Sequence, residues 1–166
     1  CGEFERIFGA SARTAGAAGW QANSLSLAAY EVAGLDYASD ARGTHPFFPR
    51  ANGTVFKTVQ IPTTLPTLDE LLGRPEYPES KLTDHYLSLL RTDRPNVLTA
   101  HAELEGMAKF EWFRTFLAAL KVRGVQIVPT ATIAAELKQN PDNVPVCDLV
   151  AGEVDGRSGT MAVQQC

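Results

Sequence analysis

Short apolar runs alternate with amphipathic segments along most of the chain. The runs predict strands at residues 13–15, 36–39, 58–61, 97–100 and 125–128. The segments between and after them have the apolar spacing of helices, which we expect over residues 24–33, 68–72, 79–91, 109–123 and 130–139. This alternation favours an α/β fold with a parallel sheet, either open or rolled into a barrel. The strands are too few to close a barrel by themselves.

The strongest helical pattern lies at residues 109–123. Lys121 and Arg123 fall in its last turn, and Gly124 supplies the stop. We expect its apolar stripe to belong to the core, and the stripe consists of Phe110, Phe113, Phe116, Leu117 and Leu120.

Two other regions depart from this alternation. Asn52-Gly53 between apolar runs predicts an inserted β-hairpin, and the proline-rich loop that follows, up to Pro78, is typical of a binding loop or lid. Within it, Thr67 and Glu70 form a capping box for a short helix. Residues 140–166 are rich in Pro, Gly, Asp and Val, so an irregular extension is expected there.

Composition narrows the class of protein. The 166 residues are 45% hydrophobic and 20% charged, which suits one globular domain with a sizeable core. The net charge of −4 comes without a long basic run, so nucleic acid is not an expected partner. No apolar stretch is long enough to cross a bilayer, although attachment to a membrane surface stays open. Cys1, Cys147 and Cys166 suggest neither a disulfide framework nor a zinc knuckle.

The first residues suggest a longer polypeptide. Phe4, Ile7 and Phe8 have helical spacing, and Gly9 stands where such a helix would end. A helix this short resembles the tail of a longer one, so we expect the 166 residues to be part of a larger protein. The alternative is a short, frayed N-terminal turn.

The sequence "NVLTAHAELEG" holds the first candidate site. If residues 97–100 are a strand, His101, Glu103 and Glu105 share one face as the strand ends. Sites in parallel α/β folds form at the carboxyl ends of strands, so His101 is a candidate general acid or base. The alternative is a core histidine beside two solvated glutamates. A zinc deaminase, which also has His-x-Glu, is excluded because the sequence has no paired-cysteine motif.

Two further stretches hold candidate site residues. In "DYASDARGTHPFFP", Asp40 and Arg42 follow a predicted strand, and they form either part of a site or a surface ion pair. In "RTAGAAGWQAN", Trp20 reaches a loop, where an exposed indole would stack on a sugar ring and a buried one would only pack.

Five motifs occur in the order found in one known family. They are "AAGWQAN", "YASDARGTHPFFP", "QIPTTLPTLDELLGR", "LTAHAELEG" and "DGRSG" followed by "QQ". The chain resembles the second half of the deformylases that act on 4-deoxy-4-formamido-arabinose carried by undecaprenyl phosphate. These enzymes belong to the polysaccharide deacetylase (NodB-like) superfamily. The resemblance implies that residues 1–139 form the C-terminal part of a distorted, incomplete (β/α) barrel and that residues 140–166 extend it.

The resemblance also implies roles for individual residues. His101 would be the general acid that protonates the departing amine, and Asp40 would orient it. Arg13 would contact a catalytic aspartate from the half of the barrel that has no counterpart here. The substrate pocket would be shaped by Trp20, Arg42, Glu103 and Glu105.

The implied reaction is metal-assisted hydrolysis of an amide. The expected cofactor is a divalent metal, zinc above others, held by residues outside this chain, so the isolated chain is expected to be inactive. The expected partners are an amino sugar on a polyprenyl phosphate, the N-terminal half of the same barrel and a second copy in a dimer. The expected location is the cytoplasm or the cytoplasmic face of the inner membrane. A non-catalytic carbohydrate- or lipid-carrier-binding module and a polysaccharide or peptidoglycan N-deacetylase are the alternatives.

Overall fold

The computed structural model describes residues 2–166, and Cys1 lies outside the described residues. It confirms a mixed α/β fold. The chain forms two compact units. Unit 1 comprises residues 1–63, 129–154 and 158–166, and unit 2 comprises residues 64–128 and 155–157. Within the described residues, no helix has the length and apolar character needed to span a membrane.

Unit 1 contains a small parallel sheet. Its strands are β1 (Thr14–Ala15), β2 (Tyr37–Ala38) and β5 (Val59–Gln60), in the order β1-β2-β5. The register pairs Tyr37 with Thr14 on one side and with Val59 on the other. Three of the predicted strands are therefore confirmed with narrower bounds.

A second sheet in unit 1 has the order β4-β3-β6-β7. Its strands are β3 (Phe48–Ala51), β4 (Thr54–Val55), β6 (Val146–Gly152) and β7 (Met161–Gln165). Asn52 and Gly53 join β3 to β4 with φ angles of 51° and 77°, as a two-residue hairpin turn requires, so the predicted hairpin is confirmed.

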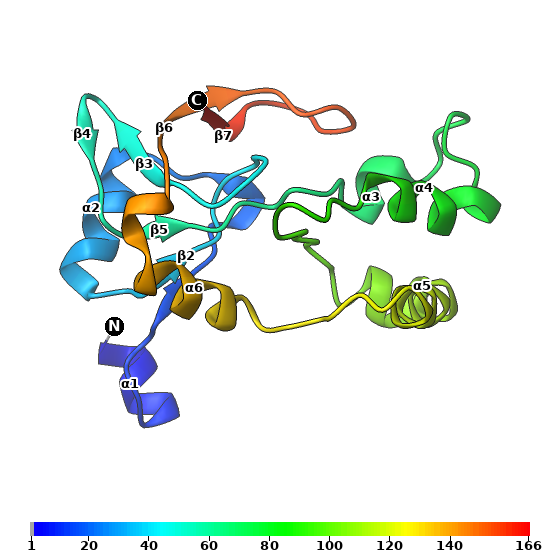
Figure 1. Cartoon of the computed structure of the whole chain (residues 1–166), viewed down its shortest axis with the longest axis horizontal. Helices are drawn as coiled ribbons and strands as arrows, with labels where there is room; N and C mark the ends of the chain where they lie inside the picture. Colours follow the sequence, from blue (N-terminus) through cyan, green and yellow to red (C-terminus); the bar gives the residue numbers. More distant parts are fainter. Residues whose placement is uncertain (1) are drawn as a thin grey trace. The chain divides into compact units, whose positions relative to one another are not determined.

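Residues 140–166 are not irregular, and that prediction is wrong. Strands β6 and β7 form an antiparallel hairpin, drawn in orange and red in Figure 1, and β6 pairs in parallel with β3. The partner of β6 lies about a hundred residues earlier in the chain, so local composition carried no sign of it. The cysteine pattern suggested no disulfide framework, whereas the structure has a disulfide between Cys147 and Cys166.

The helices of unit 1 are α1 (Gly2–Phe8), α2 (Ser24–Ala33) and α6 (Thr130–Gln139), with 3₁₀ turns η1 (Ala18–Trp20) and η4 (Pro141–Asn143). Helix α2 begins at a capping box, in which the Asn23 side chain accepts the N–H groups of Leu25 and Ser26. It ends at Gly34 in the left-handed conformation. The predicted bounds of α2 and α6 are confirmed.

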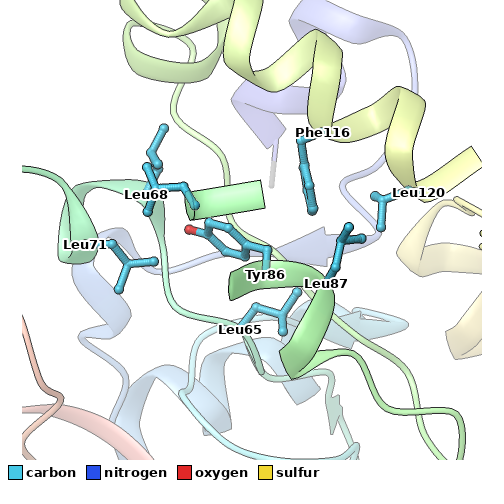
Figure 2. Close-up of a cluster of buried hydrophobic side chains, with 8 residues drawn as sticks. Leu65, Leu68, Leu71, Tyr86, Leu87, Phe116 and Leu120 are labelled. Carbon is cyan, nitrogen blue, oxygen red and sulfur yellow. The ribbon is translucent and has the colours of Figure 1, made fainter. Parts of the chain in front are cut away.

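The helices of unit 2 are α3 (Leu68–Leu71), α4 (Leu82–Leu89) and α5 (Phe110–Val122), with the 3₁₀ turn η2 (Glu79–Lys81) and the π-helical turn η3 (Leu104–Ala108). Their packed side chains form one hydrophobic cluster, shown in Figure 2. The Tyr86 ring lies at its centre, with the Phe116 ring from α5 facing it at a centroid distance of 5.3 Å. This cluster fixes α4 against α5.

Two predicted strands and one predicted core residue are wrong. Residues 97–100 form no strand: the Val97 N–H donates to the Thr64 hydroxyl, and the Val97 carbonyl accepts the N–H groups of both Thr64 and Leu65, which is not the pairing of a β-ladder. Residues 125–128 form none either, since Val125 donates back to Leu120 and closes the end of α5. Phe110, predicted as core, is 50% exposed because it occupies the first turn of α5.

This contrast within α5 gives a stability prediction. Replacing the buried Phe116 by alanine removes a ring from the Tyr86 cluster and should lower the free energy of unfolding by about 3–5 kcal/mol. Phe110→Ala, the matched control, should cost less than about 1 kcal/mol. Urea unfolding followed by circular dichroism measures both values. Equal losses for the two variants would contradict this packing.

Candidate active site

The backbone of His101 is held by Glu105. The His101 N–H donates to the Glu105 carboxylate at 2.7 Å, and the Glu105 N–H donates back to the His101 carbonyl at 2.9 Å. Glu105 is 1% exposed, so this reciprocal pair is shielded from water. The pair forms just before η3, where the extended segment that ends at His101 turns. It fixes the backbone position from which the His101 side chain projects.

The imidazole of His101 lies beside Asp69. Its Nδ1 is 3.8 Å from the Asp69 Oδ1, which is an electrostatic contact and too long for a hydrogen bond. Nδ1 is buried and has no hydrogen-bond partner among residues 2–166, as is also true of the Glu105 Oε1. The His101 side chain as a whole is 34% exposed. The histidine thus presents part of its ring to solvent and turns Nδ1 inward, near a carboxylate.

Asp69 is held from the other side by Arg157. The Arg157 guanidinium donates to the Asp69 Oδ2 at 2.8 Å and to the Thr67 hydroxyl at 3.1 Å. The Thr67 hydroxyl in turn donates to the Asp69 Oδ1. Because its carboxylate is fixed by these donors, Asp69 has a defined position next to the imidazole.

Glu70 ties the same arginine to the start of α3. Its Oε1 accepts from the Arg157 Nε at 2.7 Å, and its Oε2 accepts the Thr67 N–H at 3.0 Å, so the predicted capping box is confirmed. Gly156 lets the chain come this close, because a Cβ there would lie 2.5 Å from the Glu70 carbonyl oxygen and its φ is +83°.

The predicted alignment of His101, Glu103 and Glu105 on one strand face is wrong. The chain turns at His101 and enters η3, so the period of two does not apply. Glu105 is buried and bound to the His101 backbone, whereas Glu103 is exposed at the N-terminal side of η3. The two glutamates therefore have different surroundings, and only Glu105 supports the histidine.

Asp40 is a fully buried carboxylate in unit 1. It accepts the backbone N–H of Ala17, and the Gln60 side chain donates to its Oδ2 at 3.3 Å and accepts its N–H at 3.1 Å. Burial of the Tyr30 hydroxyl, together with the negative charge of Asp40, raises the pKa of Tyr30. These contacts exclude the alternative of a surface ion pair for Asp40. The predicted contact with His101 joins different units and stays a prediction.

Trp20 is 5% exposed, so the exposed-indole hypothesis is wrong and the buried alternative holds. Its Nε1 donates to the Thr63 hydroxyl at 3.1 Å, which fixes the ring. The Arg42 guanidinium lies 4.8 Å from the ring centroid, a cation–π distance. The backbone of Arg42 joins β7 through the carbonyl of Ala162 and the N–H of Gln164. Trp20 is therefore a platform beneath Arg42.

Arg13 forms an ion triad in unit 1. Asp36, just before β2, accepts from Arg13 and from Lys138 of α6. The Lys138 hydrogen bond, which outweighs the burial of the carboxyl, lowers the pKa of Asp36, and Arg13 adds to the effect. The expected contact of Arg13 with a catalytic aspartate from outside the chain stays a prediction.

Sequence reasoning missed the residues that support His101. Asp69, Glu70 and Arg157 received no site role, although "LPTLDELLGR" and "DGRSG" were among the matching motifs. The two motifs are more than 80 residues apart, so only the fold shows that Arg157 binds α3. Their joint occurrence was the available signal.

The implied metal has no ligand set among the candidate catalytic residues. In the described part of the chain, only His45, Cys147 and Cys166 form a group of three side chains close enough to share an ion. That group contains neither His101 nor Asp40. Among residues 2–166, the candidate catalytic residues therefore form no group suited to a metal ion.

Comparison with known proteins places this chain beside curated proteins that include two of the same name, and no protein-family model matches the chain. The probable 4-deoxy-4-formamido-L-arabinose-phosphoundecaprenol deformylase ArnD of Shewanella sediminis (strain HAW-EB3) is 32% identical over 148 residues, 89% of this chain and 46% of that protein. The protein of the same name from Wigglesworthia glossinidia brevipalpis is 30% identical over 149 residues, 89% of this chain and 51% of that protein. The chain thus spans about half the length of the curated relatives it matches, which fits the C-terminal portion indicated by the motifs.

The arginine that joins Asp69 and Glu70 gives a second stability prediction. Arg157→Met leaves the Glu70 carboxylate, which is 1% exposed, without its cation and should cost about 3 kcal/mol. Arg50→Met, the control, breaks an ion pair whose partners are nearly half exposed and should leave stability unchanged within error. Urea midpoints of the two variants test this. A smaller loss for Arg157→Met than for the control would contradict it.

The Asp36 triad gives a pH prediction. Because the folded pKa of Asp36 lies below its ordinary value of 3.8, the triad stabilises the fold above that value and loses its effect as the pH falls through the lowered pKa. In Lys138→Met, the loss of stability below about pH 4 should be less steep than in the wild type. Urea midpoints measured across the acid range check this. Parallel curves for variant and wild type would refute it.

Proposed function

We propose that this chain, which is homologous to part of the 4-deoxy-4-formamido-L-arabinose-phosphoundecaprenol deformylases, comes from a hydrolase that removes the N-formyl group of an amino sugar carried on a polyprenyl phosphate. The observation that carries the proposal is the alignment of 89% of the chain with two proteins of that name. A polyprenyl carrier resides in a membrane, so the longer protein would work peripherally, at the cytoplasmic face of the inner membrane.

In this reaction His101 acts as the general acid. Breaking the amide requires a proton for the departing nitrogen, and an imidazolium is suited to supply it near neutral pH. The one-third exposure of the side chain leaves a ring edge for the substrate, while Glu105 fixes the backbone behind it. Precise placement of the donor is what general acid catalysis needs.

Two carboxylates are candidates for orienting the imidazole. Asp69 is 3.8 Å from the His101 Nδ1, and a small rotation of the ring would bring the two into hydrogen-bond range. Asp40 is the one that the motif comparison favours, and its burial and hydrogen bonds would hold its carboxyl group in a fixed position. We propose that Asp69 holds Nδ1, so that Nε2 carries the proton toward the substrate. Asp40 would help to orient the imidazole in the longer protein, which contains both halves of the barrel.

The substrate pocket is proposed to use Arg42, Glu103 and Arg13. Arg42 rests on the Trp20 ring, which restricts the guanidinium and suits recognition of sugar hydroxyls or a phosphate. Glu103 is exposed near His101 in sequence, and Arg13 is mostly exposed, so both have side-chain surface available for contacts outside the chain. Trp20 and Glu105 support their neighbours from buried positions.

The metal and the rest of the barrel are proposed to lie outside this chain. A divalent ion, zinc above others, would supply Lewis-acid activation of the formyl carbonyl when bound. Residues 97–100 and 125–128 have strand-like sequences but no strand pairing, and Ile127 and Val128 are 65% and 44% exposed. Pairing of these segments with strands of another half would complete a distorted barrel of the polysaccharide deacetylase type.

The test uses a longer protein that also contains the half of the deformylases that this chain lacks. His101→Ala should lower kcat for an N-formyl amino-sugar substrate by about 10²–10⁴-fold, because the leaving amine then lacks its proton donor. The matched control is His85→Ala, since the His85 ring packs against the Tyr77 ring and has no proposed role. The 166-residue chain alone should show no hydrolysis.

Four outcomes would count against the proposal. An unchanged kcat in His101→Ala would remove the role of the histidine, and activity of the isolated chain would remove the need for a second half. A preference for the N-acetyl over the N-formyl substrate would replace the deformylase by an N-deacetylase. Binding of the sugar carrier without any hydrolysis would indicate a binding module.

A further inference from the structure

A second group of reactive side chains lies in unit 1, outside the proposed active site. His45 precedes β3, Cys147 lies in β6, and Cys166 follows β7 directly. The imidazole and the two sulfurs lie within 4.8 Å of one another, and the His45 Nε2 is 3.7 Å from the Cys166 Sγ. The fold thus brings one nitrogen and two sulfur donors together from three separate parts of the chain.

We propose that reduction of the Cys147–Cys166 disulfide turns this group into a Zn²⁺ site, with the His45 Nε2 and the two sulfurs as protein ligands. A dithiol reductant supplies two electrons and two protons, so the S–S bond breaks, two thiols form and the reductant becomes a disulfide. Zn²⁺ then displaces the two thiol protons and binds both thiolates, and water takes the remaining position. The disulfide-bonded form has no thiolate to offer and binds no metal.

The distances suit a tetrahedral ion. With Zn–S near 2.3 Å and Zn–N near 2.0–2.1 Å, a tetrahedral nitrogen and sulfur are about 3.6 Å apart. The His45 Nε2 and the Cys166 Sγ are already at 3.7 Å. The other ring nitrogen, Nδ1, is 2.8 Å from the Thr44 hydroxyl, the kind of second contact that orients a metal-binding histidine.

The surroundings allow the sulfurs to separate after reduction. Cys147 is buried in β6, whereas Cys166 is exposed and lies just beyond Gln165, the last residue of β7 that pairs with β6. Cys166 can therefore move while Cys147 stays. The Gln164 side chain donates to the Cys147 sulfur at 3.5 Å and to the His45 carbonyl at 3.1 Å, so it would favour a thiolate and steady the histidine.

The two states hold the same strands together by different bonds. In an oxidising environment the disulfide ties Cys166 to β6, and in a reducing one the zinc ion would tie both sulfurs to the loop before β3. The site would thus cross-link the end of β7 under both oxidising and reducing conditions. It shares no ligand with the candidate catalytic residues.

The test is a metal titration of the 166-residue chain. After reduction by a dithiol, which is then removed under nitrogen, the chain should bind one equivalent of Co²⁺ with a thiolate-to-cobalt charge-transfer band and tetrahedral d–d bands. Zn²⁺ should displace the Co²⁺. The oxidised chain should show neither band. Binding by the oxidised chain, or none by the reduced one, would overturn the proposal.

Variants separate this site from incidental thiol binding. His45→Gln should lower Zn²⁺ affinity at least about tenfold, since changes even around metal ligands commonly cost about 10–100-fold. His85→Gln is the matched control and should bind as the wild type does. If the reduced chain loses its circular dichroism signal, Zn²⁺ should restore the signal in the wild type and not in His45→Gln. Equal affinity, or equal recovery, in both histidine variants would overturn the role of His45.

Discussion

The contact between Arg157 and Glu70 is the interaction on which the candidate site depends. Helix α3 has four residues, far fewer than a helix needs to be stable alone, so its start must be held by side chains. Glu70 is buried and would be strongly unfavourable there without a cation. Arg157 supplies the cation and extends the same guanidinium to Asp69, which stands next to His101. The position of the proposed acid thus follows from an ion pair between residues 87 positions apart in the sequence.

Most of the local structure could be read from the sequence. Helices α2 and α6 have the predicted bounds, and the Asn52-Gly53 turn and the Thr67 capping box were both expected. These features depend on neighbouring residues, which is why pattern and spacing suffice. The hairpin of β6 and β7 was missed because its pairing with β3 is not local, and two apolar runs that pattern assigned to strands lack partners in a ladder.

The sequence predicted the central residue of the candidate site, His101, but not the residues that support it. His101 was identified from its place after an apolar run and from its motif, although the strand assumed for it does not form. The buried state of Trp20 and the separate surroundings of Glu103 and Glu105 depend on tertiary packing, which alternation of polar and apolar positions does not encode. Asp40 was predicted to be a site residue. Its complete burial, with hydrogen bonds from Ala17 and Gln60, could not be predicted from the sequence.

The capping box at Thr67 also limits which residue position 70 accepts. One oxygen of the Glu70 carboxylate accepts the Thr67 N–H and the other accepts the Arg157 Nε, so both face donors. Glutamine has the same shape but replaces one oxygen by an NH₂ group, and in either orientation that group would point its hydrogens at another donor. An uncharged isostere is thus excluded on hydrogen-bond grounds alone, before any loss of charge is considered. At position 70, a residue of nearly the same size as glutamate is therefore not an acceptable substitute.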